Sequence, residues 1–257
     1  VLETTIRSVV LQDYPDIEYI VMDGGSTDGS VETIQRYADR IAHWQSEADA
    51  GQTHAIRAGF ERATGDVLCW VNADDLLLPG ALSAVGAWFA ADAERRFLVS
   101  HALRLDALAR PIRRWYGAPP TFRSMLFGGT NPGFAQPASF WTRRAYEESG
   151  GLDPSYTSLM DVEWYLRLLQ GGAAGLLHAF TAAFREHGDQ KSGVLHAATA
   201  AEQDRIRERY GYERTGPLWR RVLRKHYGRR RRRHGRRAKR AMRGAAPEAA
   251  LASFLSP

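Results

Sequence analysis

The chain has 257 residues, 44% of them hydrophobic and 11% aromatic, which excludes an intrinsically disordered protein and fits one α/β domain with a substantial core. A single cysteine, Cys69, excludes an internal disulfide, and no apolar stretch approaches the roughly 20 residues that span a bilayer. We expect Cys69 to be a small core residue and the protein to be cytoplasmic.

The net charge of +6 comes from one end of the chain. Residues 219–243 hold 14 of the 35 Lys and Arg residues and no acid, whereas residues 1–218 carry 21 basic and 28 acidic residues, a net charge of −7. We therefore expect a catalytic domain over residues 1–215 and a basic tail, helical or disordered, over residues 216–257. The tail fits a solvated segment or one drawn to an anionic membrane surface; nucleic-acid binding fits less well because few aromatic residues are interleaved.

Helices and strands alternate in the first half of the chain. Hydrophobic spacing predicts a helix up to Gln12 and then three strand–helix pairs, at 17–22 and 30–40, 41–45 and 51–64, and 66–71 and 79–92. We expect a left-handed cap at Gly65. The alternation predicts an α/β fold with a mostly parallel, Rossmann-like sheet flanked by helices. Because the first helix opens without a cap and has no strand before it, we also expect a first strand upstream of residue 1.

The second half has a different pattern. Residues 97–107 and 111–115 predict antiparallel strands around a turn, and the Gly/Pro-rich stretch 127–141 leads into another strand. The remaining expected elements are helices at 142–149 and 161–170, a strand at 174–183 and a polar helix at 196–210.

Acidic residues follow the predicted strands of the first half. Asp23 follows the first strand, Asp49 lies in the loop after the second, and Asp74 and Asp75 follow the third. Ligands of open α/β sheets bind at the carboxyl ends of the strands, so these loops should converge. Adjacent carboxylates repel one another, and a divalent cation such as Mg²⁺ or Mn²⁺ offsets that repulsion. The alternative is a solvated turn capping the helix near Pro79.

The run DGGSTDGS (23–30) admits two interpretations. Its glycines allow close backbone approach, and Asp23 can accept hydrogen bonds from a nucleotide base or ribose. An Asx-type turn that feeds the next helix explains the run equally well.

Four motifs in order resemble the nucleotide-binding half of glycosyltransferase family 2, which has the GT-A fold. They are DGGSTDGS (23–30), SEADAGQ (46–52), ATGD (63–66) and NADD followed by LLLPGAL (72–82). Further on, NPGFAQPASFW (131–141), the Gly-Gly-Leu-Asp turn at 150–153 and FREHGDQKS (184–192) resemble the acceptor-side segments of that family. The resemblance covers roughly residues 1–195.

The resemblance implies an inverting sugar transfer from a nucleoside-diphosphate sugar to an acceptor hydroxyl, in the synthesis of bacterial cell-surface glycan or glycolipid. It implies Asp161 as the catalytic base, with Glu163 as the fallback, and a Mn²⁺ or Mg²⁺ ion held by Asp75 with Asp74 and His187. Lys191 could also approach the phosphates, and Trp141 and Trp164 could stack on sugar rings or belong to the core. The expected donor-binding residues are Asp23, Gly25, Ser26, Asp49, Gln52, Arg57 and Asp74.

Three departures from the family pattern leave other functions open. The first strand is absent, His54 and Arg57 stand where Asp and Asn are expected, and the helix acid motif reads Met160-Asp161-Val162-Glu163. A non-catalytic nucleotide-sugar-binding remnant and a nucleotidyltransferase are therefore alternatives. The acceptor is expected to be a glycan or a lipid-linked molecule, and the enzyme to work in the cytoplasm or peripherally on the inner face of the plasma membrane.

Overall fold

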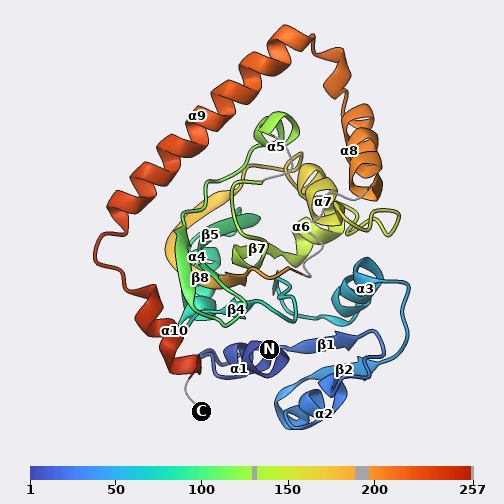
Figure 1. Cartoon of the computed structure of the whole chain (residues 1–257), viewed down its shortest axis with the longest axis vertical. Helices are drawn as coiled ribbons and strands as arrows, with labels where there is room; N and C mark the ends of the chain where they lie inside the picture. The colour runs from blue at the N-terminus through green and yellow to red at the C-terminus, as the bar shows by residue number, and fades with distance from the viewer. Residues whose placement is uncertain (129–131, 189–196, 256–257) are drawn as a thin grey trace.

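The strands form two sheets that no ladder connects in the described part of the chain (Figure 1). The computed structural model describes residues 1–128, 132–188 and 197–255. A parallel pair consists of β1 (Ile20–Asp23) and β2 (His43–Ser46), with Asp23 opposite Ser46. The second sheet has six strands. Five follow the order β3-β7-β5-β8-β4, and β6 pairs with the C-terminal residues of β5, from Ala102 to Leu105.

The six-stranded sheet is mixed rather than mostly parallel. Only the β5–β8 pairing in it is parallel, and its other pairings are antiparallel. β5 is almost wholly buried at the centre. Its strands are β3 (Val67–Leu68), β4 (Leu76–Leu77), β5 (Phe97–Leu105), β6 (Pro111–Trp115), β7 (Ser139–Thr142) and β8 (Gly175–Arg185).

The helices of the first half follow the expected order with shorter bounds. They are α1 (Leu2–Val10), α2 (Ser30–Gln35), a 3-10 turn (Ala38–Arg40), α3 (Gln52–Arg62) and α4 (Ala81–Ala90). Ile6 of α1 packs on Ile34 and Ile41, which fixes α1 beside α2. The left-handed cap expected at Gly65 is wrong, because α3 ends in an extended residue, Ala63, and the carboxylate of Glu18 accepts the following backbone N–H groups.

An aromatic cluster forms a core between the six-stranded sheet and α7. Trp141 and Trp164 are fully buried with ring centroids 4.6 Å apart, and Trp70 lies 5.3 Å from Trp141. The two buried rings therefore belong to the core and have no face open to a sugar. The helices around this core are α5 (Phe122–Gly128), a 3-10 turn (Gln136–Ala138), α6 (Arg143–Glu148), α7 (Met160–Leu168) and α8 (Ala197–Arg209).

The C-terminal part is helical and packs back on the domain. After a 3-10 turn (Tyr212–Arg214), α9 (Pro217–Ala241) runs along the outer edge of the molecule and α10 (Pro247–Leu255) returns towards α1 (Figure 1). The Arg231 guanidinium donates to the Gly128 carbonyl at 2.7 Å, and Arg114 binds the Glu248 carboxylate through two bonds of 2.7 Å. Of the helices in the described ranges, none combines the length and apolar character needed to cross a membrane.

Candidate functional site

Asp23 ends β1 and organises the turn that follows it. Its carboxylate accepts hydrogen bonds from the Ser46 hydroxyl at 2.6 Å and from the backbone N–H groups of Gly25 and Ser26 at 3.1 and 2.9 Å. Gly25 has φ 84°, which a residue with a side chain rarely adopts. Partial burial raises the pKa of Asp23, but the bonds from Ser26 and Ser46 outweigh it and leave the pKa below its usual value. Asp23 is therefore held as a carboxylate.

Asp23 and Asp49 line one cavity of about 350 Å³ with Arg57 and His54. The Asp49 carboxylate accepts from the Gly51 N–H at 2.7 Å, and a Cβ on Gly24 would lie 3.1 Å from that carboxylate. The Arg57 guanidinium lies 3.4 Å from Glu61 on the same helix. The structure thus brings together three of the residues that the sequence predicts to bind the donor.

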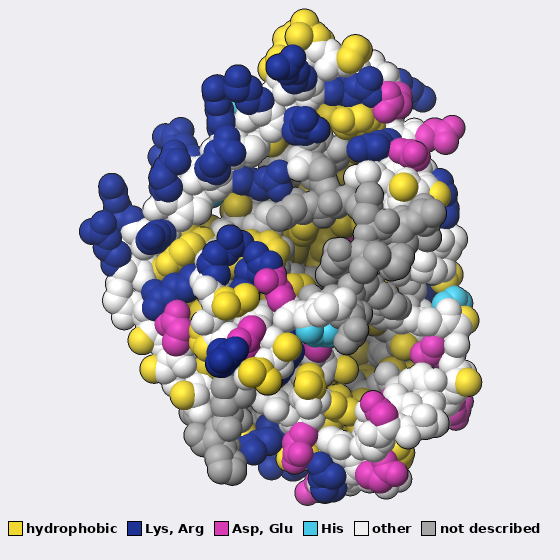
Figure 2. Space-filling view, viewed as in Figure 1, with side chains coloured by type: hydrophobic (Ala, Val, Ile, Leu, Met, Phe, Trp, Pro, Cys, Tyr) yellow, Lys and Arg dark blue, Asp and Glu magenta, His cyan; other side chains and the backbone are white. Residues whose placement is uncertain are grey.

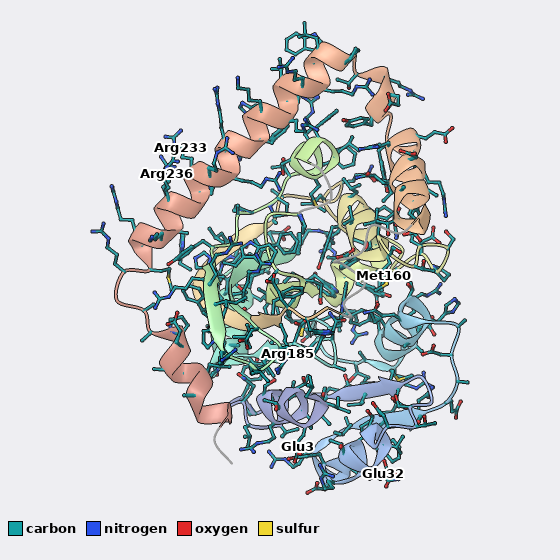
Figure 3. The ribbon with its side chains drawn as sticks, in the orientation of Figure 1. Glu3, Glu32, Met160, Arg185, Arg233 and Arg236 are labelled. Carbon is teal, nitrogen blue, oxygen red and sulfur yellow. The ribbon has the colours of Figure 1, made fainter. Side chains whose placement is uncertain are left out.

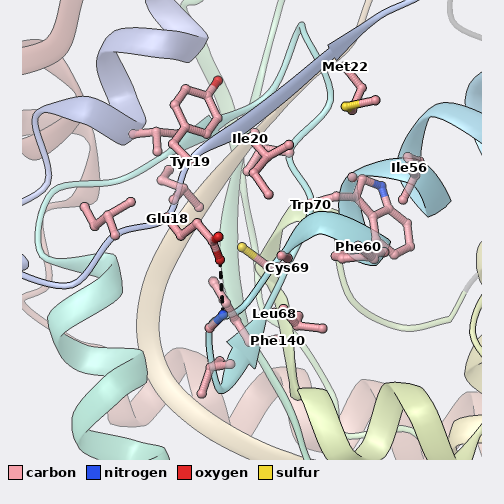
Figure 4. Close-up of a pocket in the computed structure, with 18 of the residues that line it drawn as sticks. Glu18, Tyr19, Ile20, Met22, Ile56, Phe60, Leu68, Cys69, Trp70 and Phe140 are labelled. Atoms are coloured by element: carbon pink, nitrogen blue, oxygen red, sulfur yellow. Dashed lines mark hydrogen bonds between the residues drawn. The ribbon is translucent and has the colours of Figure 1, made fainter. Parts of the chain in front are cut away.

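A second cavity, of about 520 Å³, separates β1 from β3 (Figure 4). Its walls are mainly apolar and include Ile20, Leu68 and Trp70. Cys69 also lines it, and burial raises the pKa of this thiol to about 12, so the thiol stays protonated near neutral pH. At its polar end the cavity reaches Gly24, Asp49, Gln52 and Asn72. The two cavities share three lining residues, Met22, Asp49 and Ala55.

Asn72 hydrogen-bonds three polar side chains from different parts of the fold, and the sequence analysis assigned it no role. Its side-chain oxygen accepts from the Gln52 amide at 3.0 Å, and its own amide donates to Asp75 at 3.1 Å and to Gln136 at 3.2 Å. Gln136 in turn donates to the Trp70 carbonyl at 3.0 Å. Asn72 and Gln136 both lie in motifs that carry the family resemblance, but neither had been assigned a role.

The two adjacent acids differ sharply in exposure. Asp75 is 1% exposed, and its carboxylate accepts from the Arg185 backbone N–H at 3.1 Å. Burial, with a further contribution from the Asp74 charge, raises the pKa of Asp75 to about 8. The Asp74 side chain is 27% exposed and lies 3.0 Å from the His187 Nε2. The accessible acid is therefore Asp74, not Asp75, which was expected to hold the cation.

The donor set at this loop fits a divalent cation that shares its coordination with phosphate. Within the described ranges, no three His, Cys, Asp or Glu side chains are grouped to hold a metal ion by themselves. Asp74 and His187 nevertheless form a pair open to solvent, with Asp75 behind them. Mg²⁺ and Mn²⁺ sites commonly use one or two carboxylates and complete their shell with water and substrate phosphates.

Asp161 lies at the start of α7, which contacts α3. The Thr53 hydroxyl, next to Gln52, donates to the Tyr156 carbonyl at 2.8 Å and lies 2.7 Å from the Met160 sulfur. Asp161 therefore directly follows Met160, which contacts α3 beside the donor-binding candidate Gln52. Burial raises the pKa of Asp161 to about 6, and the nearby Glu202 charge adds to the effect. A carboxyl with this pKa suits proton transfer near neutral pH.

Glu163 belongs to a buried ion-pair network. Its side chain is 0% exposed, and its oxygens accept from the Arg167 guanidinium at 2.7 and 3.0 Å and from the Tyr210 hydroxyl at 3.0 Å. No oxygen of Glu163 reaches solvent, so this position does not suit a general base. Lys191, the other residue expected near the phosphates, lies outside the described residues.

Comparisons with known proteins show the family of the chain. Residues 1–151 match Glycosyl transferase family 2. An uncharacterized glycosyltransferase of Mycobacterium tuberculosis is 30% identical over 172 residues, which cover 65% of this chain and 63% of that protein. A PGL/p-HBAD biosynthesis glycosyltransferase of Mycobacterium bovis is 27% identical over 201 residues, 76% of this chain and 75% of that protein. The chain thus spans less than two thirds of the first of these relatives.

Solved structures show the same fold at low identity. S. aureus TarS 1–349 in complex with UDP-GlcNAc superposes with a TM-score of 0.61 at 13% identity, over 76% of this chain and 58% of that one. The mannosyltransferase PcManGT from Pyrobaculum calidifontis, in complex with GDP-Man and Mn²⁺, gives 0.55 at 18% identity, over 98% and 74%. The likeness shows that the chain has the expected GT-A fold.

Proposed function

Because this chain belongs to glycosyl transferase family 2, we propose that it moves a sugar from a nucleoside-diphosphate sugar to an acceptor hydroxyl, with inversion at the anomeric carbon. One observation carries the proposal. Gln52 and Asn72 line the second cavity together with Asp49 and are joined by a direct hydrogen bond, and Asn72 also donates to Asp75, next to Asp74. A ligand with a nucleoside at one end and a charged diphosphate at the other fits such a site.

The nucleoside part of the donor binds in the cavity of Asp23, Asp49 and Arg57. Asp23 is fixed as a carboxylate by its hydrogen bonds, so it accepts hydrogen bonds from a base or a ribose without reorganising. Gly25 and Ser26 supply backbone that approaches closely. Gln52 and Asn72 line the second cavity, which shares Asp49 with the first, and this position suits contacts to the ribose or diphosphate.

Asp161 acts as the general base. The acceptor oxygen attacks the anomeric carbon, the bond from that carbon to the diphosphate breaks, and the hydroxyl proton passes to the Asp161 carboxylate. The nucleoside diphosphate leaves without any covalent intermediate on the protein. A positioned base of this kind contributes roughly 10²–10⁴-fold to the rate.

Asp74 and His187 would hold a Mn²⁺ or Mg²⁺ ion, with Asp75 supporting the loop from below. Such an ion supplies positive charge that stabilises the leaving diphosphate. The Mn²⁺ and GDP-Man bound to PcManGT support this part of the proposal. Hexosyl transfer is supported by that complex and by UDP-GlcNAc in TarS.

We further propose that the acceptor is a glycan or a lipid-linked molecule of the bacterial cell surface, and that the enzyme works at the inner face of the plasma membrane. The support is the basic helix α9, which gives the anionic domain a cationic edge. The name of the mycobacterial relative, which places it in PGL/p-HBAD biosynthesis, is in keeping with such an acceptor.

Release of nucleoside diphosphate tests the proposal. UDP-GlcNAc and GDP-Man are incubated with the chain with and without Mn²⁺, and we expect release that depends on the ion. Asp74→Asn and Asp161→Asn should each abolish most of it, whereas Asp204→Asn, an exposed acid on α8, should not. Release of pyrophosphate from a nucleoside triphosphate would instead identify a nucleotidyltransferase. Donor binding without turnover would identify a non-catalytic protein.

A further inference from the structure

Helix α9 has one packed face and one open face. Tyr227 and Ala238 are buried, and Leu223 and Arg231 are half-buried, so these residues form a stripe towards the domain. In chain order, Leu223, Tyr227, Arg231 and Ala238 are spaced by four, four and seven residues, which is the spacing of one face of an α-helix. On the opposite face, the side chains are exposed over most of the 25 residues of the helix.

Apolar side chains are exposed at the first turns of α9. Leu218 is 72% exposed, Trp219 is 64% exposed and Val222 is 45% exposed. Seven large hydrophobic side chains are exposed in the described part of the chain, and these three fall within five consecutive residues. Figure 2 shows hydrophobic atoms at the top of the molecule, where α9 begins, with Lys and Arg side chains next to them. The first turns of α9 therefore carry a local cluster of exposed apolar side chains, a feature typical of interaction surfaces.

Arginines continue the same open face along the helix. At 100° per residue, Leu218, Val222, Arg229, Arg233 and Arg236 fall within one narrow sector opposite Tyr227, with Trp219 at its flank. Figure 3 shows Arg233 and Arg236 pointing away from the body of the molecule. We call Leu218, Trp219, Val222, Arg229, Arg233 and Arg236 the outer face of α9.

We propose that the outer face of α9 docks on an anionic lipid bilayer, with its apolar end inserted among the headgroups. Leu218 and Val222 gain by leaving water, and Trp219 is of the residue type that settles at the membrane interface. The three arginines lie on the phosphate layer, where each contributes to attraction by anionic lipid. Nucleic acid shares the charge complementarity but offers no apolar layer for Leu218 and Val222.

The charge of the remaining chain fixes the orientation of docking. Residues 1–218 carry a net charge of −7, so an anionic surface repels the domain and attracts only the α9 edge. α9 is tied to the domain through Arg231 and α5, next to the segment expected on the acceptor side. The proposal rests on the proposed function in one respect, since a lipid-linked acceptor gives membrane docking its use.

Vesicle cosedimentation of the full chain tests the proposal. We expect binding to vesicles of phosphatidylcholine with phosphatidylglycerol, and little binding to phosphatidylcholine alone. Replacing Arg229, Arg233 and Arg236 by Gln should weaken anionic binding roughly 10²-fold at 0.15 M salt, and the difference should shrink at 1 M salt. Trp219→Ala should weaken binding roughly tenfold at both salt concentrations.

A matched triple variant controls for net charge. Arg110, Arg113 and Arg144 are exposed on other elements, and their replacement by Gln removes the same charge. Equal loss in this variant, or equal binding of the unaltered chain to neutral vesicles, would overturn the proposal. So would a Gln triple of the outer face that keeps full vesicle binding but loses binding to a DNA or RNA oligonucleotide.

Nucleoside-diphosphate release separates this proposal from the enzymatic one. With a soluble acceptor, the outer-face variants should release nucleoside diphosphate as fast as the unaltered chain, because these residues lie outside the donor site. Absent release with intact vesicle binding would count against the transferase and leave the docking surface standing.

Discussion

The side-chain amide of Gln52 donates a hydrogen bond of 3.0 Å to the side-chain oxygen of Asn72. This bond links the start of α3, which lines the second cavity, to the loop of Asp74 and Asp75. Gln52 begins α3, whereas Asn72 follows β3 in the six-stranded sheet. Asn72 also donates to Asp75 and Gln136, so one side chain positions three polar neighbours.

Replacing Asn72 by Leu should impair catalysis more than stability. The substitution leaves Gln52 and Asp75 without their partner, at a cost of about 1–3 kcal/mol for a buried polar group. We expect kcat/KM to fall roughly 10–100-fold, mainly through a higher KM for the donor. Steady-state kinetics with UDP-GlcNAc or GDP-Man measure it. Gln35→Leu, on the exposed side of α2, is the control, and an Asn72→Leu enzyme with unaltered KM would contradict the linkage.

The pH dependence of the rate should report Asp161. A base must be deprotonated to accept the acceptor proton, and burial raises the pKa of Asp161 to about 6. The rate should therefore rise about tenfold per pH unit below pH 6 and level off near neutrality. Asp161→Asn should lower kcat roughly 10²–10⁴-fold and remove this inflection. An inflection that persists in the variant would assign it to another group.

Removing the Glu163 carboxylate should destabilise the folded protein rather than only slow catalysis. Glu163→Gln leaves the largely buried Arg167 without its carboxylate, and Arg209 keeps only Asp153, at 3.8 Å. Breaking one partner of a buried ion pair costs about 3–5 kcal/mol, so we expect that loss in urea unfolding. Asp204→Asn breaks an exposed pair with Arg207 and should cost less than about 1 kcal/mol. A stable but inactive Glu163→Gln enzyme would restore Glu163 as a base.

Stability should fall as pH rises, because of Asp75. Its pKa is about 8 in the folded chain and about 3.9 when unfolded, so between these values the folded state binds more protons. The contribution is full below about pH 4 and is lost as pH rises through 8, with a slope of at most about 1.4 kcal/mol per pH unit. Asp75→Asn does not titrate. The unfolding free energy of the unaltered protein minus that of Asp75→Asn should therefore fall from pH 5 to 8. A constant value of this quantity would refute the shift.

The sequence allowed most helices of residues 1–210 and the longer strands to be predicted because their hydrophobic periods are clear, whereas α5 (Phe122–Gly128) was missed. The expected helix at 161–170 is α7 (Met160–Leu168), and the strand at 97–107 is β5. β4 (Leu76–Leu77) was missed, since two residues carry no period and form a strand only by pairing with β8. The expected strand 66–71 has only two paired residues, because only Val67 and Leu68 find partners on β7.

The site was predictable in its acids but not in their environments. Asp23, Asp49 and Asp74 were identified from motifs that end strands. Whether Asp74 or Asp75 faces solvent depends on Arg185, which is 110 positions from Asp75, and no local pattern encodes that contact. Glu163 looked like a second candidate base because it shares the first turn of α7, yet its partner Tyr210 comes from beyond α8.

The absence of a backbone ladder between β1 and β3 has a mechanical consequence for the donor site. Asp23 and Asp49 sit on one hydrogen-bonded unit, and Asn72 and Asp74 on the other. The contacts between the two units include side-chain hydrogen bonds from Gln52 to Asn72 and from Thr5 on α1 to the Ala73 carbonyl. The spacing between the nucleoside end and the diphosphate end of the proposed site therefore depends on side-chain contacts between the two units.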